Sequence, residues 1–352
     1  MFVCILQHHK QEYCATTAGT GSGAFFFYSW LLRVRVEALE ALMFFTTSDD
    51  AKLWYDDWNN NDNNQPVLVF LHGFTSYRIS WGHQKNGAAW LLANQFGNYR
   101  CVFLETRGCN DSREAPGPYT IQQQAIDVIA LADFLNIQTF TFCGHSMGGG
   151  TGFELAATVP ERLHKLVLLA PVPSDGIQSM LNPDPTPPRK RTHVLHHTLY
   201  PSWTKEEYEQ AVERFVVLDE GRPSSTMEFF RDRARMVTEI SQDYWIQSQE
   251  SIGKLRLSDA MKKCEIPTLI IAGATDTLLL ANVHDAFRMP DAVLHVSAIS
   301  GHETALHDPI GVAGAIHSFM EGQTISQKKF RKSVNRKLKE RGHLPIPPRP
   351  KM

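Results

Sequence analysis

Short apolar runs recur along the chain, and each is followed by a loop or a turn. They cover residues 67–71, 101–105, 139–143, 165–170, 267–272 and 292–297. Unbroken apolar runs of about four to eight residues are typical of strands that are buried on both faces of a sheet. Helix-like segments lie between them, such as residues 121–135 and 151–159. This alternation predicts an α/β fold with a mainly parallel sheet flanked by helices.

The hydrophobic pattern begins at Met43. Strand-like residues 44–47 and 52–55 flank a polar turn and predict an opening β-hairpin. Upstream, residues 24–32 form an apolar run about half as long as a membrane span. This run comes too late, and without an early charged region, for an ordinary signal peptide. We expect translation to start at Met43 and residues 1–42 to be a disordered or artefactual extension, with a short membrane-associating segment as the alternative.

The alternation stops between residues 173 and 263. A proline-rich linker is followed there by amphipathic segments near 204–217, 225–240 and 242–261. Because a structureless loop of this length is implausible in a compact domain, we expect a helical cap at residues 173–263, inserted after the sixth strand. The core would then comprise residues 43–172 and 264–321. The cap residues expected to form an apolar substrate wall are Phe229, Phe230, Met236, Tyr244 and Trp245, with ordinary helix packing as the alternative for each.

Charge is unevenly distributed along the chain. Residues 322–352 carry ten Lys or Arg and one Glu, so the net charge of −2 for the whole chain leaves −11 for the rest. An acidic body argues against nucleic-acid binding, and the basic, proline-rich end predicts a flexible tail. We expect a cytoplasmic protein, and leave its oligomeric state open. The final Pro350-Lys351-Met352 loosely resembles the Ser-Lys-Leu address, which makes the peroxisome the alternative.

The six cysteines have no C-x-x-C pair and no metal-site spacing, which favours free thiols in a reducing compartment. Three histidines, His193, His196 and His197, have a helical spacing compatible with a metal pair. No carboxylate or cysteine nearby completes a metal shell. The sequence therefore predicts no metal site.

One serine has the sequence context of a nucleophile. Residues 144–148 read Gly-His-Ser-Met-Gly, with a strand-like run before them and helix-forming residues after them. A strand, a Gly-x-Ser-x-Gly turn and a helix make a nucleophile elbow, in which the two glycines leave room for a sharp turn. Ser146 would stand at the N-terminus of the helix, where backbone N–H groups stabilise an oxyanion.

A nucleophilic serine needs a base, and the base needs a group that orients it. His302 follows the strand-like run 292–296, and Asp276 follows the run 267–273. Both are therefore expected at the carboxyl ends of parallel strands, where the catalytic groups of open α/β sheets gather. The chain order Ser146, Asp276, His302 is that of the α/β-hydrolase triad. The alternatives for the acid are Asp285, Asp291 and Asp308.

Taken together, these segments resemble the α/β-hydrolase superfamily, and most of all its small, capped serine esterases. The segments are His72-Gly73-Phe74 with Trp81, Thr106-Arg107-Gly108 with Ser112, residues 144–149, Gly273 with Asp276, and Gly301-His302 with Asp308-Pro309. The likeness covers roughly residues 43–321. One departure is Glu105, where relatives often have the aspartate of Asp-x-Arg-Gly. The resemblance implies an oxyanion hole built from the backbone N–H groups of Phe74 and Met147, and a structural role for His72.

These residues predict a serine hydrolase that needs no cofactor. It would cleave a carboxylic ester, lactone or thioester of a small-to-medium apolar substrate through an acyl-enzyme on Ser146. A serine nucleophile argues against the dehalogenase and epoxide-hydrolase branches, which use aspartate. One alternative is a carbon–carbon bond hydrolase with the same triad, although Phe74-Thr75-Ser76-Tyr77 replaces the glycine-rich segment that such relatives often have. The other is a non-catalytic ligand-binding receptor on the same scaffold.

Overall fold

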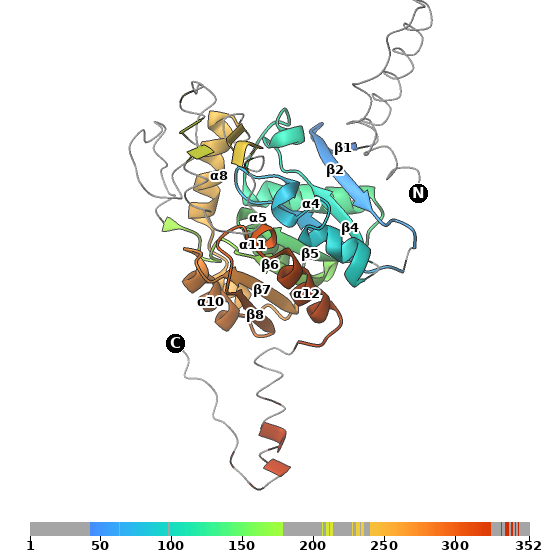
Figure 1. The fold of residues 1–352 in the computed structure, drawn as a ribbon, viewed down its shortest axis with the longest axis vertical. Helices are drawn as coiled ribbons and strands as arrows, with labels where there is room; N and C mark the ends of the chain where they lie inside the picture. The colour runs from blue at the N-terminus through green and yellow to red at the C-terminus, as the bar shows by residue number, and fades with distance from the viewer. Residues whose placement is uncertain are drawn as a thin grey trace, which may run out of the picture. The chain divides into compact units, whose positions relative to one another are not determined.

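The residues that the computed structural model describes form an eight-stranded sheet in the order β1-β2-β4-β3-β5-β6-β7-β8 (Figure 1). They comprise residues 43–178 apart from 63 and 98, residues 240–324, and scattered positions between 206 and 235 and between 332 and 344. The strands are β1 (Phe44–Thr46), β2 (Lys52–Trp58), β3 (Val67–Leu71), β4 (Arg100–Leu104), β5 (Phe140–His145), β6 (Leu163–Leu169), β7 (Thr268–Gly273) and β8 (Ala292–Ser297). The opening hairpin and all six apolar runs therefore form strands. Their bounds agree with the expected ones to within two residues, except that β2 runs three residues further than expected, to Trp58.

Strand β2 pairs antiparallel with β4, whereas the pairs from β4 through β8 are all parallel. Parallel neighbours need a crossover between them, and helices supply most of these crossovers. The described helices are α3 (Ala88–Leu91), α4 (Ile121–Phe134), α5 (Met147–Thr158), α8 (Gln242–Lys254), α9 (Ser258–Met261), α10 (Leu279–Arg288), α11 (Thr304–His307) and α12 (Pro309–Met320), with short helical turns η2 (Arg78–Trp81), η3 (Leu92–Phe96), η4 (Asn110–Ser112) and η5 (Pro160–Arg162). The mainly parallel sheet flanked by helices is thus confirmed.

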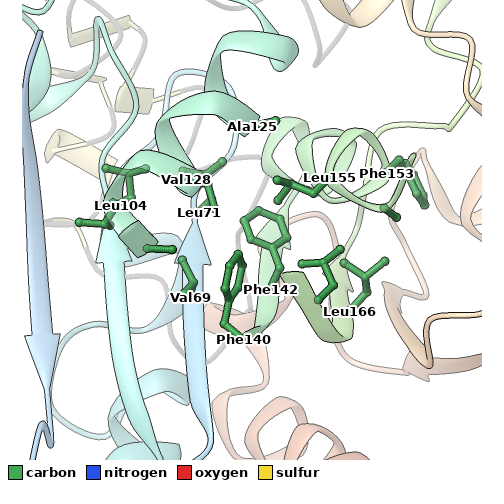
Figure 2. Packing of buried hydrophobic residues seen from close by; sticks show 14 of the residues in the cluster. Val69, Leu71, Leu104, Ala125, Val128, Phe140, Phe142, Phe153, Leu155 and Leu166 are labelled. Carbon is green, nitrogen blue, oxygen red and sulfur yellow. The ribbon is translucent and has the colours of Figure 1, made fainter. Parts of the chain in front are cut away.

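Helices cover both faces of the sheet. On one face, side chains of β3, β5 and β6 pack with those of α4 and α5 in a single apolar cluster, and Figure 2 shows Phe142 between Leu155 and Val69. On the other face, the Lys165 Nζ of β6 donates to the carbonyls of Phe319 and Met320 in α12, at 3.0 and 2.8 Å. Alternate residues of a strand point to opposite faces, and each large apolar side chain buried in this way contributes about 1.5–3 kcal/mol.

A buried arginine holds the loop that follows β4. Arg107 donates two hydrogen bonds to Asp127 of α4, at 2.8 and 2.7 Å, and two more to Asp49, at 2.6 and 2.8 Å. The bond from Arg107 is the largest of the effects that hold the pKa of Asp49 well below its usual range. Bidentate pairs of this kind fix direction as well as distance. Arg107 therefore ties the opening hairpin, the loop after β4 and α4 together.

Glu105, the departure from the Asp-x-Arg-Gly pattern, is fully buried at the end of β4. Its carboxylate accepts hydrogen bonds from the Asn110 side chain and the Asp111 backbone N–H, each at 3.0 Å, and pairs with Arg78. The longer side chain of Glu105 thus reaches the η4 turn and holds it through these hydrogen bonds.

The predicted cap is described only in part. Helix α8 begins after Ser241, whose hydroxyl accepts the N–H of Tyr244 at 3.0 Å and so caps the helix. Its Ser251 hydroxyl accepts the N–H of Ile121, the first residue of α4, at 2.8 Å. Most of the segments 204–217 and 225–240 lies outside the described residues, so the cap boundaries stay a prediction.

Three other predictions fall on parts of the chain that the structure does not describe. They concern residues 1–42, the histidines at 193, 196 and 197, and the C-terminal tripeptide. Among the described residues, no helix is long and apolar enough to cross a membrane.

Candidate active site

Ser146 stands on a strained turn between β5 and α5. β5 ends at His145, α5 begins at Met147, and the intervening serine has φ 53° and ψ −113°. Such a backbone costs on the order of 1–3 kcal/mol outside glycine and persists only where the surroundings impose it. Here the Ser146 N–H donates to the Leu169 carbonyl at 2.9 Å, and its carbonyl accepts the Val172 N–H at 3.0 Å. The strand, turn and helix expected around Ser146 are therefore present.

The two glycines of the motif are required by close backbone contacts. A Cβ on Gly144 would lie 2.2 Å from the carbonyl oxygen of Gly148. A Cβ on Gly148 would lie 2.6 Å from the carbonyl oxygens of both Leu71 and His72. Neither distance is compatible with a side chain. The turn therefore packs directly against the end of β3.

Two hydrogen bonds connect the serine to the histidine and the aspartate. His302 Nε2 lies 3.0 Å from Ser146 Oγ, and His302 Nδ1 lies 3.0 Å from Asp276 Oδ2. The second carboxylate oxygen of Asp276 accepts the Leu278 N–H at 3.1 Å. The Asp276 side chain is 1% exposed, whereas that of His302 is 32% exposed. The buried carboxylate thus holds one nitrogen of a ring whose other nitrogen faces the serine.

Electrostatics favour an ionised Asp276. Burial by itself raises the pKa of this carboxyl, but the charge of His302 and the hydrogen bond to it outweigh burial and bring the pKa below its ordinary value. An ionised carboxylate can only accept a hydrogen bond. Its bond to Nδ1 therefore places a proton on Nδ1 and leaves Nε2 of neutral His302 free to accept the serine proton.

The three alternative aspartates have other positions and partners. Asp285 of α10 accepts hydrogen bonds from the Ser174 hydroxyl and from Arg288, both at 2.6 Å. Asp308 caps α12 through a backbone N–H in its first turn, at 2.9 Å. Asp291 directly precedes β8 and so lies at the opposite end of that strand from His302. This geometry favours Asp276 as the acid.

The His72-Gly73-Phe74 segment runs beside the serine. His72 Nε2 accepts the Thr106 N–H at 3.0 Å, which assigns the ring proton to Nδ1, and this atom lies 2.8 Å from the Gly73 carbonyl. A Cβ on Gly73 would lie 2.9 Å from the Ser146 Cβ, so the backbone passes close to the elbow. Both of these His72 bonds go to backbone groups, as expected of a structural residue, and it is Gly73 that lies against the serine.

The second predicted oxyanion donor, Met147, is the first residue of α5. N–H groups in the first turn of a helix have no partner within the helix and carry the positive end of its dipole. Met147 directly follows Ser146, and Phe74 packs against the apolar cluster that contains Met147. An oxyanion hole built from the N–H groups of these two residues stays a prediction.

Of the five cap residues expected to form a substrate wall, two lie against Phe74. The Tyr244 ring stacks on Phe74 with centroids 5.7 Å apart, and the Trp245 ring lies 5.0 Å from it. Phe230 is buried. The other two, Phe229 and Met236, lie outside the described residues.

One residue near the site went unnoticed in the sequence. The His145 Nε2 lies 3.0 Å from the His302 carbonyl oxygen, so the elbow holds the loop of the base directly. The only sequence signal was its place beside Ser146, which by itself does not indicate a contact 157 residues away. Within the described part of the chain, no group of three or more His, Cys, Asp or Glu residues could hold a metal ion.

Comparison with known proteins agrees with this geometry. A family model described as the alpha/beta hydrolase fold matches residues 66–309. The chain belongs to the α/β hydrolase family. It is similar to the bifunctional esterase/perhydrolase DCH of Acinetobacter calcoaceticus, with 25% identity over 246 residues that cover 66% of this chain and 82% of that protein. It is also similar to the non-heme chloroperoxidase CPO-A1 of Kitasatospora aureofaciens, with 28% identity over 290 residues that cover 74% and 92%.

Among solved structures, the enol-lactonase from Burkholderia xenovorans LB400 superposes with a TM-score of 0.60 at 22% identity, covering 79% of this chain and 99% of that one. At that identity the likeness shows the fold alone. The family and its esterase relatives make this α/β hydrolase an enzyme of the hydrolase type.

Proposed function

We propose that this α/β hydrolase is a serine hydrolase that cleaves the ester, lactone or thioester bond of a small-to-medium apolar substrate. The observation that carries the proposal is the pair of 3.0 Å hydrogen bonds from Ser146 through His302 to Asp276. A nucleophile, its base and a group that orients the base are the minimum set for acyl transfer. The serine stands at a helix N-terminus, as oxyanion stabilisation requires.

The reaction follows from these positions. Ser146 Oγ attacks the substrate carbonyl carbon while His302 Nε2 takes the hydroxyl proton. The N–H groups of Phe74 and Met147 stabilise the negative oxygen of the tetrahedral intermediate. His302 then protonates the leaving group, and an acyl-enzyme remains on Ser146. Water, activated by the same histidine, hydrolyses this ester and restores the free serine.

Three aromatic side chains support the proposal that the substrate is apolar. Phe74 packs on the buried rings of Tyr244 and Trp245 and also against the apolar cluster that contains Met147 of α5. Apolar walls with a few placed polar groups are usual in small-molecule sites. A bifunctional esterase/perhydrolase among the relatives agrees with ester substrates.

Turnover of p-nitrophenyl esters from acetate to octanoate tests the proposal, together with labelling by a fluorophosphonate probe directed at activated serines. We expect labelling at Ser146 and turnover that depends on acyl length. Absence of both would overturn the proposal. Ligand binding without either result would support the receptor alternative, and turnover confined to dienol-ketones would support the carbon–carbon bond hydrolase.

The pH profile of kcat/KM should show a single acidic limb. Only neutral His302 can accept the serine proton, so activity should rise as the imidazole loses its proton. Asp276 has a lowered pKa, stays ionised throughout, and should add no second titration. Because imidazoles in unfolded peptides titrate at about pH 6.5, rates are best measured from about pH 5 to 8. A flat profile, or a limb with a two-proton slope, would contradict a histidine base oriented by an ionised aspartate.

A chain that begins at Met43 is expected to fold and to keep its activity. Strand β1 starts at Phe44, and every residue of the proposed site lies after it. Melting temperature and ester turnover are to be compared between this chain and the full chain, with both values expected to agree. A large loss of either would show that residues 1–42 belong to the functional fold.

A further inference from the structure

Thr75, the residue after the proposed oxyanion donor Phe74, has an unfavourable backbone conformation. Its φ is 50°, in the left-handed region, and the residue is 3% exposed. A β-branched residue is rare there because its side chain crowds the backbone. Some contact must therefore hold this turn. We call residues 72–77 the oxyanion loop.

The contact comes from helix α8. The Thr75 N–H donates to the Tyr244 hydroxyl at 3.2 Å, across 169 residues of sequence. Tyr244 is 1% exposed, so water cannot easily replace its hydroxyl. A buried backbone N–H without a partner is costly, and this hydroxyl satisfies one at the point of strain.

The ring of Tyr244 has little freedom to move. It stacks on Phe74 at an interplanar angle of 12°, and the Tyr119 ring meets it edge-on at 5.5 Å. A Cβ on Gly108 would lie 2.6 Å from its Cδ2, so the backbone closes a third side. The hydroxyl position is thus determined by packing.

We propose that Tyr244 is a positioning residue of the hydrolase: its hydroxyl holds the oxyanion loop in the turn that directs the Phe74 N–H at the reacting carbonyl oxygen. The inference rests on the proposed function. Tyr244 acts through Phe74 and belongs to α8, within the expected cap. Oxyanion stabilisation therefore depends on how α8 packs against the oxyanion loop. The Tyr244 hydroxyl keeps its proton at every pH used for the assays, because burial raises the pKa of Tyr244 well above its ordinary value.

The test compares Tyr244→Phe with Tyr119→Phe in the full chain. The first variant removes the hydroxyl and keeps the stacked ring. The second removes a hydroxyl from the same aromatic group, where it donates to the Ala115 carbonyl at 3.3 Å and also bonds to the Ser241 side chain, but not to the oxyanion loop. We expect Tyr244→Phe to lower kcat by about 10- to 100-fold, which is no more than the effect of removing a whole oxyanion donor. KM should stay within about twofold of the wild-type value. Tyr119→Phe should keep the wild-type kcat.

Two further measurements separate positioning from loss of fold. Binding of an alkyl trifluoromethyl ketone, which forms a tetrahedral adduct on serine, should weaken in Tyr244→Phe by the same factor as kcat/KM falls. The pH midpoint of the acidic limb should not move, since His302 and Asp276 are untouched. An unchanged kcat, or a loss confined to KM, would overturn the inference.

A glycine at position 75 provides the second variant, because glycine adopts the left-handed turn without strain. If Tyr244 acts by holding Thr75, removing its hydroxyl should cost less in the Thr75→Gly background than in the wild type. Equal losses in both backgrounds would show that the two sites are independent and would overturn the inference. Wild-type protein without turnover or fluorophosphonate labelling would overturn the proposed function, and this inference with it. An active wild type with Tyr244→Phe equal to Tyr119→Phe would overturn this inference alone.

Discussion

Replacement of Ser146 by alanine should lower kcat for ester hydrolysis on the order of 10⁴- to 10⁶-fold, because removing the nucleophile of a triad abolishes the covalent route. The fold should survive, since the turn at residue 146 is held by main-chain bonds to Leu169 and Val172. Alanine in the same left-handed turn keeps those bonds. Turnover of p-nitrophenyl butyrate and thermal denaturation measure the two effects separately.

Ser258→Ala is a matched control, because Ser258 begins α9 away from the hydrogen bonds of the site. It should retain wild-type turnover and fluorophosphonate labelling, whereas Ser146→Ala should lose both. Undiminished hydrolysis by Ser146→Ala, or labelling at another residue, would show that the nucleophile lies elsewhere.

Replacement of Asp276 by asparagine is expected to lower kcat by about 10⁴-fold. Asparagine is nearly isosteric but can donate to Nδ1, so it stabilises the imidazole tautomer whose Nε2 carries the proton and cannot accept one from Ser146. It also removes the charge that stabilises the imidazolium formed during attack. KM should change little, because the carboxylate does not contact the substrate.

Asp285→Asn and Asp308→Asn serve as controls for the choice of acid. Asp285 pairs with Arg288, and Asp308 caps α12. These substitutions should therefore lower the melting temperature while kcat stays close to the wild-type value. Retention of most activity in Asp276→Asn, with a large loss of kcat in either control, would show that the acid is wrongly assigned.

The sequence by itself determined the elements of the core and the nucleophile turn. Strands buried on both faces must be apolar throughout, and this property is readable as an unbroken run such as residues 67–71, which form β3 without any shift in bounds. The elbow is in part a local structure, because Gly144 must lack a side chain for the turn to close on Gly148. Gly148 lacks one for a tertiary reason, since the turn packs against the end of β3. The order of Ser146, Asp276 and His302 along the chain, each after a strand, is also readable from the sequence. The rule that catalytic residues gather at the carboxyl edge of a parallel sheet then predicts that the three lie close together.

Only the tertiary structure decided which groups meet across long separations. It brought Asp276 to the ring of His302, whereas Asp285 and Asp308 bond to other groups. The partners of a carboxylate cannot be read from spacing in the sequence. It placed β4 outside β3, an order that apolar runs do not encode. It also brought Tyr244 to the N–H of Thr75, across 169 residues. A hydrophobic pattern specifies which face of an element is buried, whereas the partner of a buried polar atom depends on how the elements pack against one another.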